Sequence, residues 1–317
     1  MFMSKIPSDI THLSCKTHTL FPKSKKELES IIKNEINSQG IRADLNHIDV
    51  SGIKDFSGLF EKTSFNGDIS EWDVSNAKNM AGMFMRSSFD GDISDWDVSA
   101  VTNMQEMFME SEFNQDISGW DVSNVKNMSY MFAQSKFIND ISMWDVRNVR
   151  DMSYMFKNAR FNGSLKHWNT SSSTNMHGMF YKSEFNQNIS RWNVSKVKDM
   201  GRMFCFAKSF DQDLSGWNVS GVNDMSLMFY GSNFNHDVSQ WNIRKVRSMP
   251  LMFADCPFDQ DLKDWDVSNV SDMECMFFMN KAFNHDISGW NISACSNVKH
   301  MFDCAECSQE YRPYYKA

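Results

Sequence analysis

The residues of this 317-residue chain that could do chemistry are its eight histidines, seven cysteines and forty carboxylates. The histidines occupy unrelated positions, and neither a glycine-rich phosphate loop nor a nucleophile elbow is present. Cys304 and Cys307 have the spacing of half a zinc site, but no second pair follows them. We therefore expect a protein that is not an enzyme and that uses no cofactor and no metal ion.

Aspartates recur at a fixed spacing in two rows, and two interpretations account for them. Like charges close to one another repel, so something must compensate them. Either each carboxylate accepts backbone N–H groups at a turn, or a row of calcium ions lies between them. Asparagine and Ser164 replace aspartate in these rows, which favours the backbone donors. The rows contain Asp68, Asp92, Asp116, Asp140, Asp213, Asp237, Asp261 and Asp286, and Asp73, Asp97, Asp121 and Asp145.

Residues that differ between otherwise similar segments are the candidates for binding a partner. Tyr130 and Tyr154 lie at equivalent places 24 residues apart, with Arg147 and Arg150 close in sequence. Tyrosine and arginine are favoured at protein interfaces. These four residues are our predicted partner-binding set, and stacking for stability is the alternative role for the tyrosines.

A row of basic residues offers a second candidate surface, six residues after a tryptophan: Lys78, Lys126, Arg150, Lys198 and Arg247. It is either a nucleic-acid-binding edge or a solvated face whose cations neutralise nearby aspartates. The net charge of −8 argues against binding phosphates, so we favour the solvated face.

The spacing of the tryptophans indicates the architecture that positions these residues. All ten recur in one register, 24 residues apart seven times and 25 twice, from Trp72 to Trp290. A fixed period of this length predicts a repeat solenoid in which each unit buries its apolar face against its neighbours. We expect the indoles to be stacked in the interior, because ten exposed ones would form too large an apolar patch.

One unit shows two patterns, for example residues 113–132. Residues 117–122 read as one short strand, and Val125, Met128, Met131 and Phe132 have the spacing of a short helical or 3₁₀ turn. Methionine and phenylalanine recur in these places, which indicates a core of thioether and aromatic contacts.

The period defines three regions. Residues 48–302 form the solenoid, residues 1–47 an N-terminal segment with a capping helix, and residues 303–317 a C-terminal cap. The capping helix begins at a capping box at Ser24 and ends at Gly40. Tyr311, Tyr314 and Tyr315 are expected to cover the other end.

The recurring pattern Trp-Asp-Val-Ser-Asn-Val-x-x-Met-x-x-Met-Phe, followed by Phe-Asn-x-Asp-Ile-Ser-x-Trp, resembles the BspA-like leucine-rich repeat family. The resemblance covers residues 41–302, in the branch of unknown function that mycoplasma lipoproteins share with bacterial surface proteins. It implies a right-handed, leucine-rich-repeat-like solenoid with a binding role, often in adhesion.

We therefore expect the protein to function by binding through the surface of its solenoid. The leading hypothesis is a protein-binding scaffold without enzymatic activity, one form of which is an inhibitor or decoy of a host protein. A surface adhesin or structural component is the alternative, and nucleic-acid binding by the basic edge is a third hypothesis. The sequence shows no signal peptide, membrane segment, lipobox or cell-wall anchor, so we expect an intracellular, cytoplasmic protein, with surface display only by a non-standard route.

Overall fold

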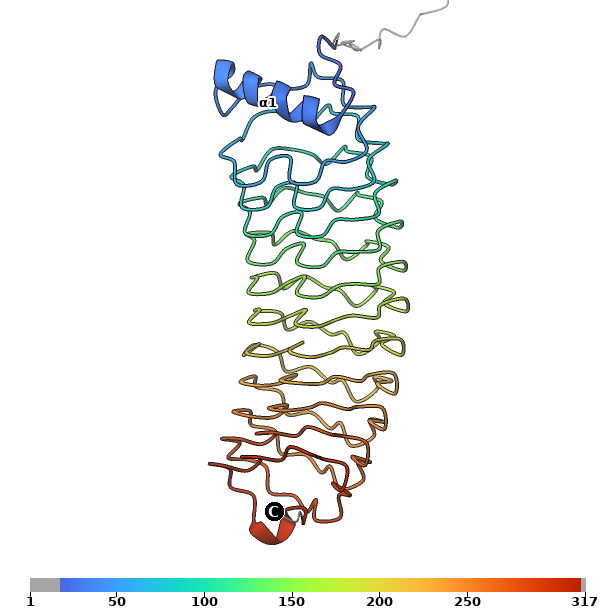
Figure 1. The fold of residues 1–317 in the computed structure, drawn as a ribbon, viewed down its shortest axis with the longest axis vertical. Coiled ribbons are helices and arrows are strands. Elements are labelled where there is room, and N and C mark those ends of the chain that lie inside the picture. Colours follow the sequence, from blue (N-terminus) through green and yellow to red (C-terminus); the bar gives the residue numbers. More distant parts are fainter. Residues whose placement is uncertain (1–17, 315–317) are drawn as a thin grey trace, which may run out of the picture.

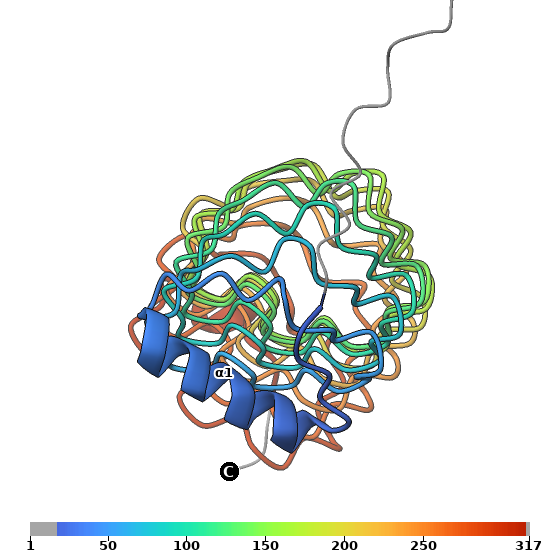
Figure 2. The same ribbon diagram turned by 90° about the horizontal axis from the view of Figure 1, so that it is seen from above.

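The computed structural model describes residues 18–314, which form one elongated stack of similar turns of chain (Figure 1). Viewed along the stack, successive turns follow a common closed outline (Figure 2). Each turn is one sequence unit, because residues one unit apart are joined by parallel bridges, such as Asn79 to Asn103 and Asn103 to Asn127. The chain is a repeat protein whose units are stacked in sequence order.

The described units contain no strand or helix of their own, so the structure does not support the short strand and helical or 3₁₀ turn that the sequence pattern predicts for each unit. The described helices are α1 (Lys25–Gln39) and the 3₁₀ helix η1 (Gln309–Tyr311), and both lie outside the solenoid. Pairing between the described units is limited to isolated bridges. The segment read as a strand is a turn instead, in which the Trp120 N–H donates to the Ile117 carbonyl at 3.2 Å.

Left-handed residues explain why no helix forms after each tryptophan. The tenth and fourteenth residues after the tryptophan, here called positions +10 and +14, have positive φ; Gly82 (62°) and Arg86 (55°) are examples. Such residues interrupt a right-handed helix. Backbone N–H groups here donate in turn to a carbonyl of the same unit and to one of the next unit. The Met83 N–H donates to the Met80 carbonyl at 3.2 Å and closes a turn, whereas the Gly82 N–H donates to the Gln105 carbonyl of the next unit at 2.7 Å. Hydrogen bonds between units therefore take the place of helical ones.

The interior is a set of aromatic columns, as the sequence predicts. Every tryptophan is buried, with 3–5% of its surface exposed. Each indole Nε1–H donates to a backbone carbonyl of the preceding unit, as Trp120 does to Ile93 at 3.1 Å. Phe108 stacks on Phe132, the equivalent residue one unit later, with ring centroids 5.8 Å apart, and on Phe113, five residues later in the chain, at 4.2 Å. Aromatic stacking thus joins equivalent residues along the stack as well as residues close in sequence.

Helix α1 lies across the N-terminal end of the stack (Figures 1 and 2). The Ser24 side chain caps it by accepting the Glu27 N–H at 3.3 Å, and it ends at Gly40, whose φ is 88°. Leu28 and Ile32 are buried in the core. The helix therefore covers apolar surface that the first unit would otherwise expose.

At the other end, η1 is joined to the last units, since the Ile287 N–H donates to the Tyr311 carbonyl at 2.9 Å. The Arg312 guanidinium lies 4.8 Å from the centre of the Phe302 ring. Tyr311 packs against the core, but Tyr314 is 81% exposed, so it does not cover this end as expected. Tyr315 lies outside the described residues.

Candidate interaction surface

The aspartate rows are held by backbone donors. The Asp116 carboxylate accepts the Ser118 N–H at 2.9 Å, and this bond is the main cause that lowers the pKa of Asp116. Asn188, at the equivalent place in a later unit, accepts the Ser190 N–H at the same distance of 2.9 Å. The backbone bonds expected from the sequence are thus present, and residues 18–314 contain no group of three or more histidine, cysteine, aspartate or glutamate side chains placed to hold a metal ion.

The two predicted tyrosines lie together. Tyr130 and Tyr154 occupy position +10 of consecutive units with φ of 58° and 55°, and their rings stack at 4.7 Å with an angle of 24° between planes. Both side chains are half-buried, and this burial is the main cause that raises the pKa of each hydroxyl.

Aromatic contacts continue along the same side of the stack. Tyr154 meets Tyr181 edge to face at 6.4 Å, Tyr181 meets Phe206 at 6.3 Å, and Phe206 meets Tyr230 at 4.7 Å. All are half-buried. We call Tyr130, Tyr154, Tyr181, Phe206 and Tyr230 the aromatic ridge.

Two glycines make room for the ridge. A Cβ atom on Gly178 would lie 2.3 Å from Cε1 of Tyr154, and one on Gly231 would lie 2.5 Å from Cδ1 of Phe206. Gly178 follows Tyr154 by one unit at position +10, and Gly231 follows Phe206 by one unit at position +14. Each ring therefore occupies the space that the next unit's side chain would take.

Lysines cover the ridge. The Lys157 ammonium lies 5.9 Å, 5.5 Å and 6.0 Å from the ring centres of Tyr130, Tyr154 and Tyr181. The Lys182 ammonium lies 5.4 Å from the centre of Tyr181 and 5.5 Å from that of Phe206. Cation–π contacts of this kind contribute about 0.5–1 kcal/mol at exposed sites.

The two predicted arginines are not brought to the tyrosines. Arg147 turns to its own neighbour, with Nε 2.9 Å from Oδ1 of Asp145, and lines a different cavity of about 470 Å³ together with Met143 and His167. Arg150 is exposed in the basic row. The cation over the ring pair is Lys157, which sequence reasoning missed together with Tyr181, Phe206 and Tyr230. These residues share positions +13 and +14, so an inspection of the residues that follow the Met-Phe pair in each unit would have found them.

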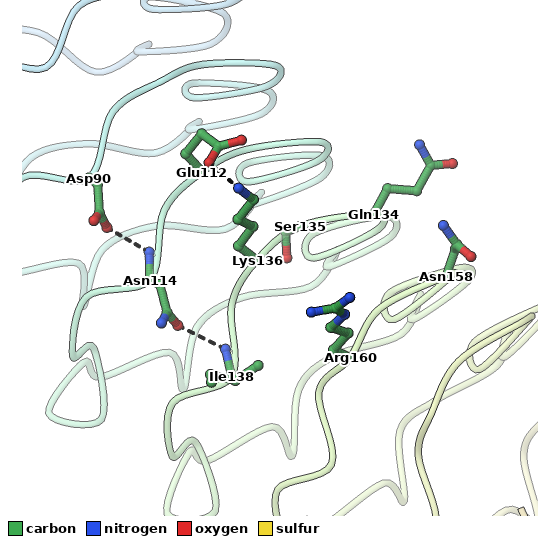
Figure 3. Close-up of a pocket in the computed structure, with 9 residues that line it drawn as sticks. All are labelled: Asp90, Glu112, Asn114, Gln134, Ser135, Lys136, Ile138, Asn158 and Arg160. Atoms are coloured by element: carbon green, nitrogen blue, oxygen red, sulfur yellow. Dashed lines mark hydrogen bonds and ion pairs between the residues drawn. The ribbon is translucent and has the colours of Figure 1, made fainter. Parts of the chain in front are cut away.

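A cavity of about 760 Å³ opens along the units that contain the two tyrosines, although neither tyrosine lines it (Figure 3). Gln134 and Asn158, which lie at position +14 of the tyrosines' own units, form one side of it. The other side contains Asn114 and Ile138, which lie at equivalent places in consecutive units. The Asn114 Oδ1 accepts the Ile138 N–H at 2.9 Å. The Ile138 side chain has no oxygen that could accept the N–H of Asn162, the equivalent residue of the following unit. Ile138 is 57% exposed. The cavity therefore combines an exposed apolar side chain with the polar groups around it.

The basic row is exposed, but carboxylates lie beside it. Asp151, Asp199 and Asp224 occupy the next position of the sequence, where the units bridge one another. Its cations also bind backbone, since Lys198 Nζ donates to the Gly221 carbonyl at 3.3 Å and the Arg247 guanidinium to the Asn269 carbonyl at 3.0 Å. This row is therefore not a continuous positive surface.

Comparison with known families finds one described as Mycoplasma protein of unknown function, DUF285, whose model matches residues 27–140, 133–233 and 214–313. The chain belongs to this family. The three overlapping matches span the solenoid and most of α1, in keeping with a protein built by repetition. A comparison with curated proteins finds no match. No helix in the described part of the chain has the length and apolar character needed to cross a membrane.

Proposed function

We propose that this chain is a protein-binding repeat scaffold without enzymatic activity, and that the aromatic ridge is its binding surface. The single observation behind the proposal is the unbroken series of ring contacts from Tyr130 to Tyr230, half-exposed and covered by two lysines. Tyrosine and phenylalanine are enriched in protein interfaces, where rigid rings bury much area at little entropic cost.

Position along the stack also supports the ridge. The buried frame is nearly the same in every unit, so it cannot define one place along the solenoid for a partner. Ring-to-ring contacts at positions +10, +13 and +14 are confined to the units between Tyr130 and Tyr230, and the cavity of Figure 3 opens at one end of this stretch. Ile138 in that cavity would accept an apolar side chain of the partner.

The finer classification also belongs to the proposal. We assign the solenoid to the leucine-rich-repeat-like architectures of the BspA-like family on the Trp-Asp-Val-Ser and Met-Phe patterns. Inhibition or sequestration of a host protein is one form that such binding would take. Arg147 and Arg150 would then act only if the interface extends beyond the ridge.

The test is affinity capture from the native host with the full chain as bait, quantified against a triple variant, Tyr130→Ala with Tyr154→Ala and Tyr181→Ala. Alanine keeps the Cβ atom, so positions +10 and +13 keep their backbone preferences. The matched control is Tyr314→Ala, which removes an exposed tyrosine outside the ridge. We expect one protein that wild type and control retain and the triple variant loses. A partner that all three baits retain equally would show that the ridge is not the interface.

A further inference from the structure

The cations at positions +10, +13 and +14 of the ridge differ in their ion pairs from those at the same positions elsewhere in the stack. In an earlier part of the solenoid, Arg86 at position +14 forms a two-pronged pair with Glu110 at position +14 of the next unit, at 2.9 Å and 3.0 Å. Lys62 likewise lies 2.6 Å from its neighbour Glu61. Where these turns carry cations outside the ridge, carboxylates of the chain neutralise them.

Within the ridge the acidic partners are missing. Positions +10, +13 and +14 of the units of Trp144, Trp168 and Trp192 hold three cations, Lys157, Lys182 and Arg202, and no carboxylate. In the described structure none of the three has a carboxylate oxygen within 4.0 Å, although the whole chain has a net charge of −8. Lys182 and Arg202 are exposed. A local positive charge thus lies on top of aromatic surface in an acidic protein.

We infer that the segment that binds the aromatic ridge is an acidic, extended stretch of protein, in which aspartate or glutamate alternates with aromatic or aliphatic residues. The inference rests on the proposed function and names the partner's chemistry. The carboxylates would meet Lys157, Lys182 and Arg202, which are presented by successive units. The apolar side chains would pack on the rings between these cations. An extended chain presents every second side chain to one side, which suits a surface that repeats along an axis.

One observation favours an acidic protein segment over a nucleic acid. Sequence-tolerant binding of single strands needs free ring faces on which bases stack. The facing sides of Tyr130 and Tyr154 are already stacked on one another at 4.7 Å, so they offer no free face to a base.

The test is selection of short random peptides displayed on phage against the full chain, followed by fluorescence anisotropy with the selected peptides. The informative variant is Asn158→Glu, which places a carboxylate at position +14 next to Lys182, as Glu110 lies next to Arg86. Glutamate is compatible with the left-handed backbone there, because Glu110 has φ 54° and Asn158 has φ 51°. The second variant is Lys157→Gln with Lys182→Gln. The matched control is Lys126→Gln with Lys198→Gln in the basic row.

We expect enriched peptides rich in aspartate, glutamate and aromatic residues, whose affinity falls about tenfold with the Lys157 and Lys182 double variant, as two exposed charge pairs would give. Asn158→Glu should weaken them as well, and the control should not. Binding should also weaken between about 0.1 M and 1 M salt, where the screening length falls from about 10 Å to 3 Å. Peptides without acidic residues that still need Tyr154 would overturn the acidic partner but keep the ridge. Peptides indifferent to every ridge variant, no enrichment, or displacement by oligo-dT at equal concentration would overturn the inference.

Discussion

Replacing Gly178 by alanine tests whether the ridge is built as described. The residue has φ 59°, where an alanine costs about 1 kcal/mol relative to glycine. The new Cβ would lie 2.3 Å, 2.5 Å and 2.9 Å from three atoms of the Tyr154 ring, so the ring must move. Moving it breaks the stack on Tyr130, worth about 0.5–1.5 kcal/mol. We therefore expect Gly178→Ala to lower the free energy of unfolding by about 1.5–2.5 kcal/mol.

The chain contains its own control for this change. Gly82 lies at the same position +10 with φ 62°, but the nearest atom to its Cβ would be Cβ of Met85 at 3.8 Å, an ordinary contact. Gly82→Ala should therefore show only the backbone cost of about 1 kcal/mol. Urea titration followed by tryptophan fluorescence measures both, and the difference should vanish when Gly178→Ala is made in a Tyr154→Ala background. Equal losses for the two glycines, or additivity with Tyr154→Ala, would refute the placement of the ring.

Three further predictions follow from the aspartate rows and the cysteines. Asp116→Asn should leave the melting temperature at neutral pH unchanged, because Asn188 accepts the same backbone bond in its own unit. The pKa of Asp116 is lowered in the folded state, so its contribution is present above the unfolded value near 3.9 and is lost as the pH falls through the folded value; the variant should lose less stability in acid than wild type. Treatment with EDTA should leave the melting temperature unchanged, and a fall that calcium restores would show that the rows bind cations. Iodoacetamide at about pH 8 should alkylate the exposed Cys304 but spare Cys205 and Cys256 until urea is added, because burial raises the pKa of both thiols to about 12; rapid alkylation of either in the native protein would contradict their burial.

The buried frame could be predicted from the sequence because it repeats. Trp120 and its equivalents must face the same environment in every unit, and only an interior accommodates ten indoles. The period could not reveal the backbone of the unit, however. Val125, Met128, Met131 and Phe132 have helical spacing, yet the left-handed Tyr130 between them turns the chain differently. Spacing records which side chains face inward, and several backbones can place the same four residues there.

The binding surface could be predicted only in part, for a related reason. Tyr130 and Tyr154 stood out because the same residue occurs twice at one position. Lys157 and Phe206 occur once each at theirs, and their relation to the tyrosines depends on the turn geometry, which brings positions +10, +13 and +14 to one side. Arg147 is close to Tyr154 in sequence, but it lies in the turn after the tryptophan and pairs with Asp145.

The left-handed positions connect the architecture to the proposed surface. Position +10 must have positive φ in each unit, and glycine, as at Gly82 and Gly178, meets this need without strain. The chain nevertheless places a tyrosine there in two consecutive units, at a conformational cost of about 1 kcal/mol or more each. The Tyr130–Tyr154 stack returns about 0.5–1.5 kcal/mol, which is less than the combined cost of about 2 kcal/mol, so stacking alone gives no net stabilisation. The half-exposed rings under Lys157 remain available for contact with another molecule. If that account is right, replacing both tyrosines by glycine should hardly change stability while abolishing binding, and a large loss of stability would assign the pair to the fold instead.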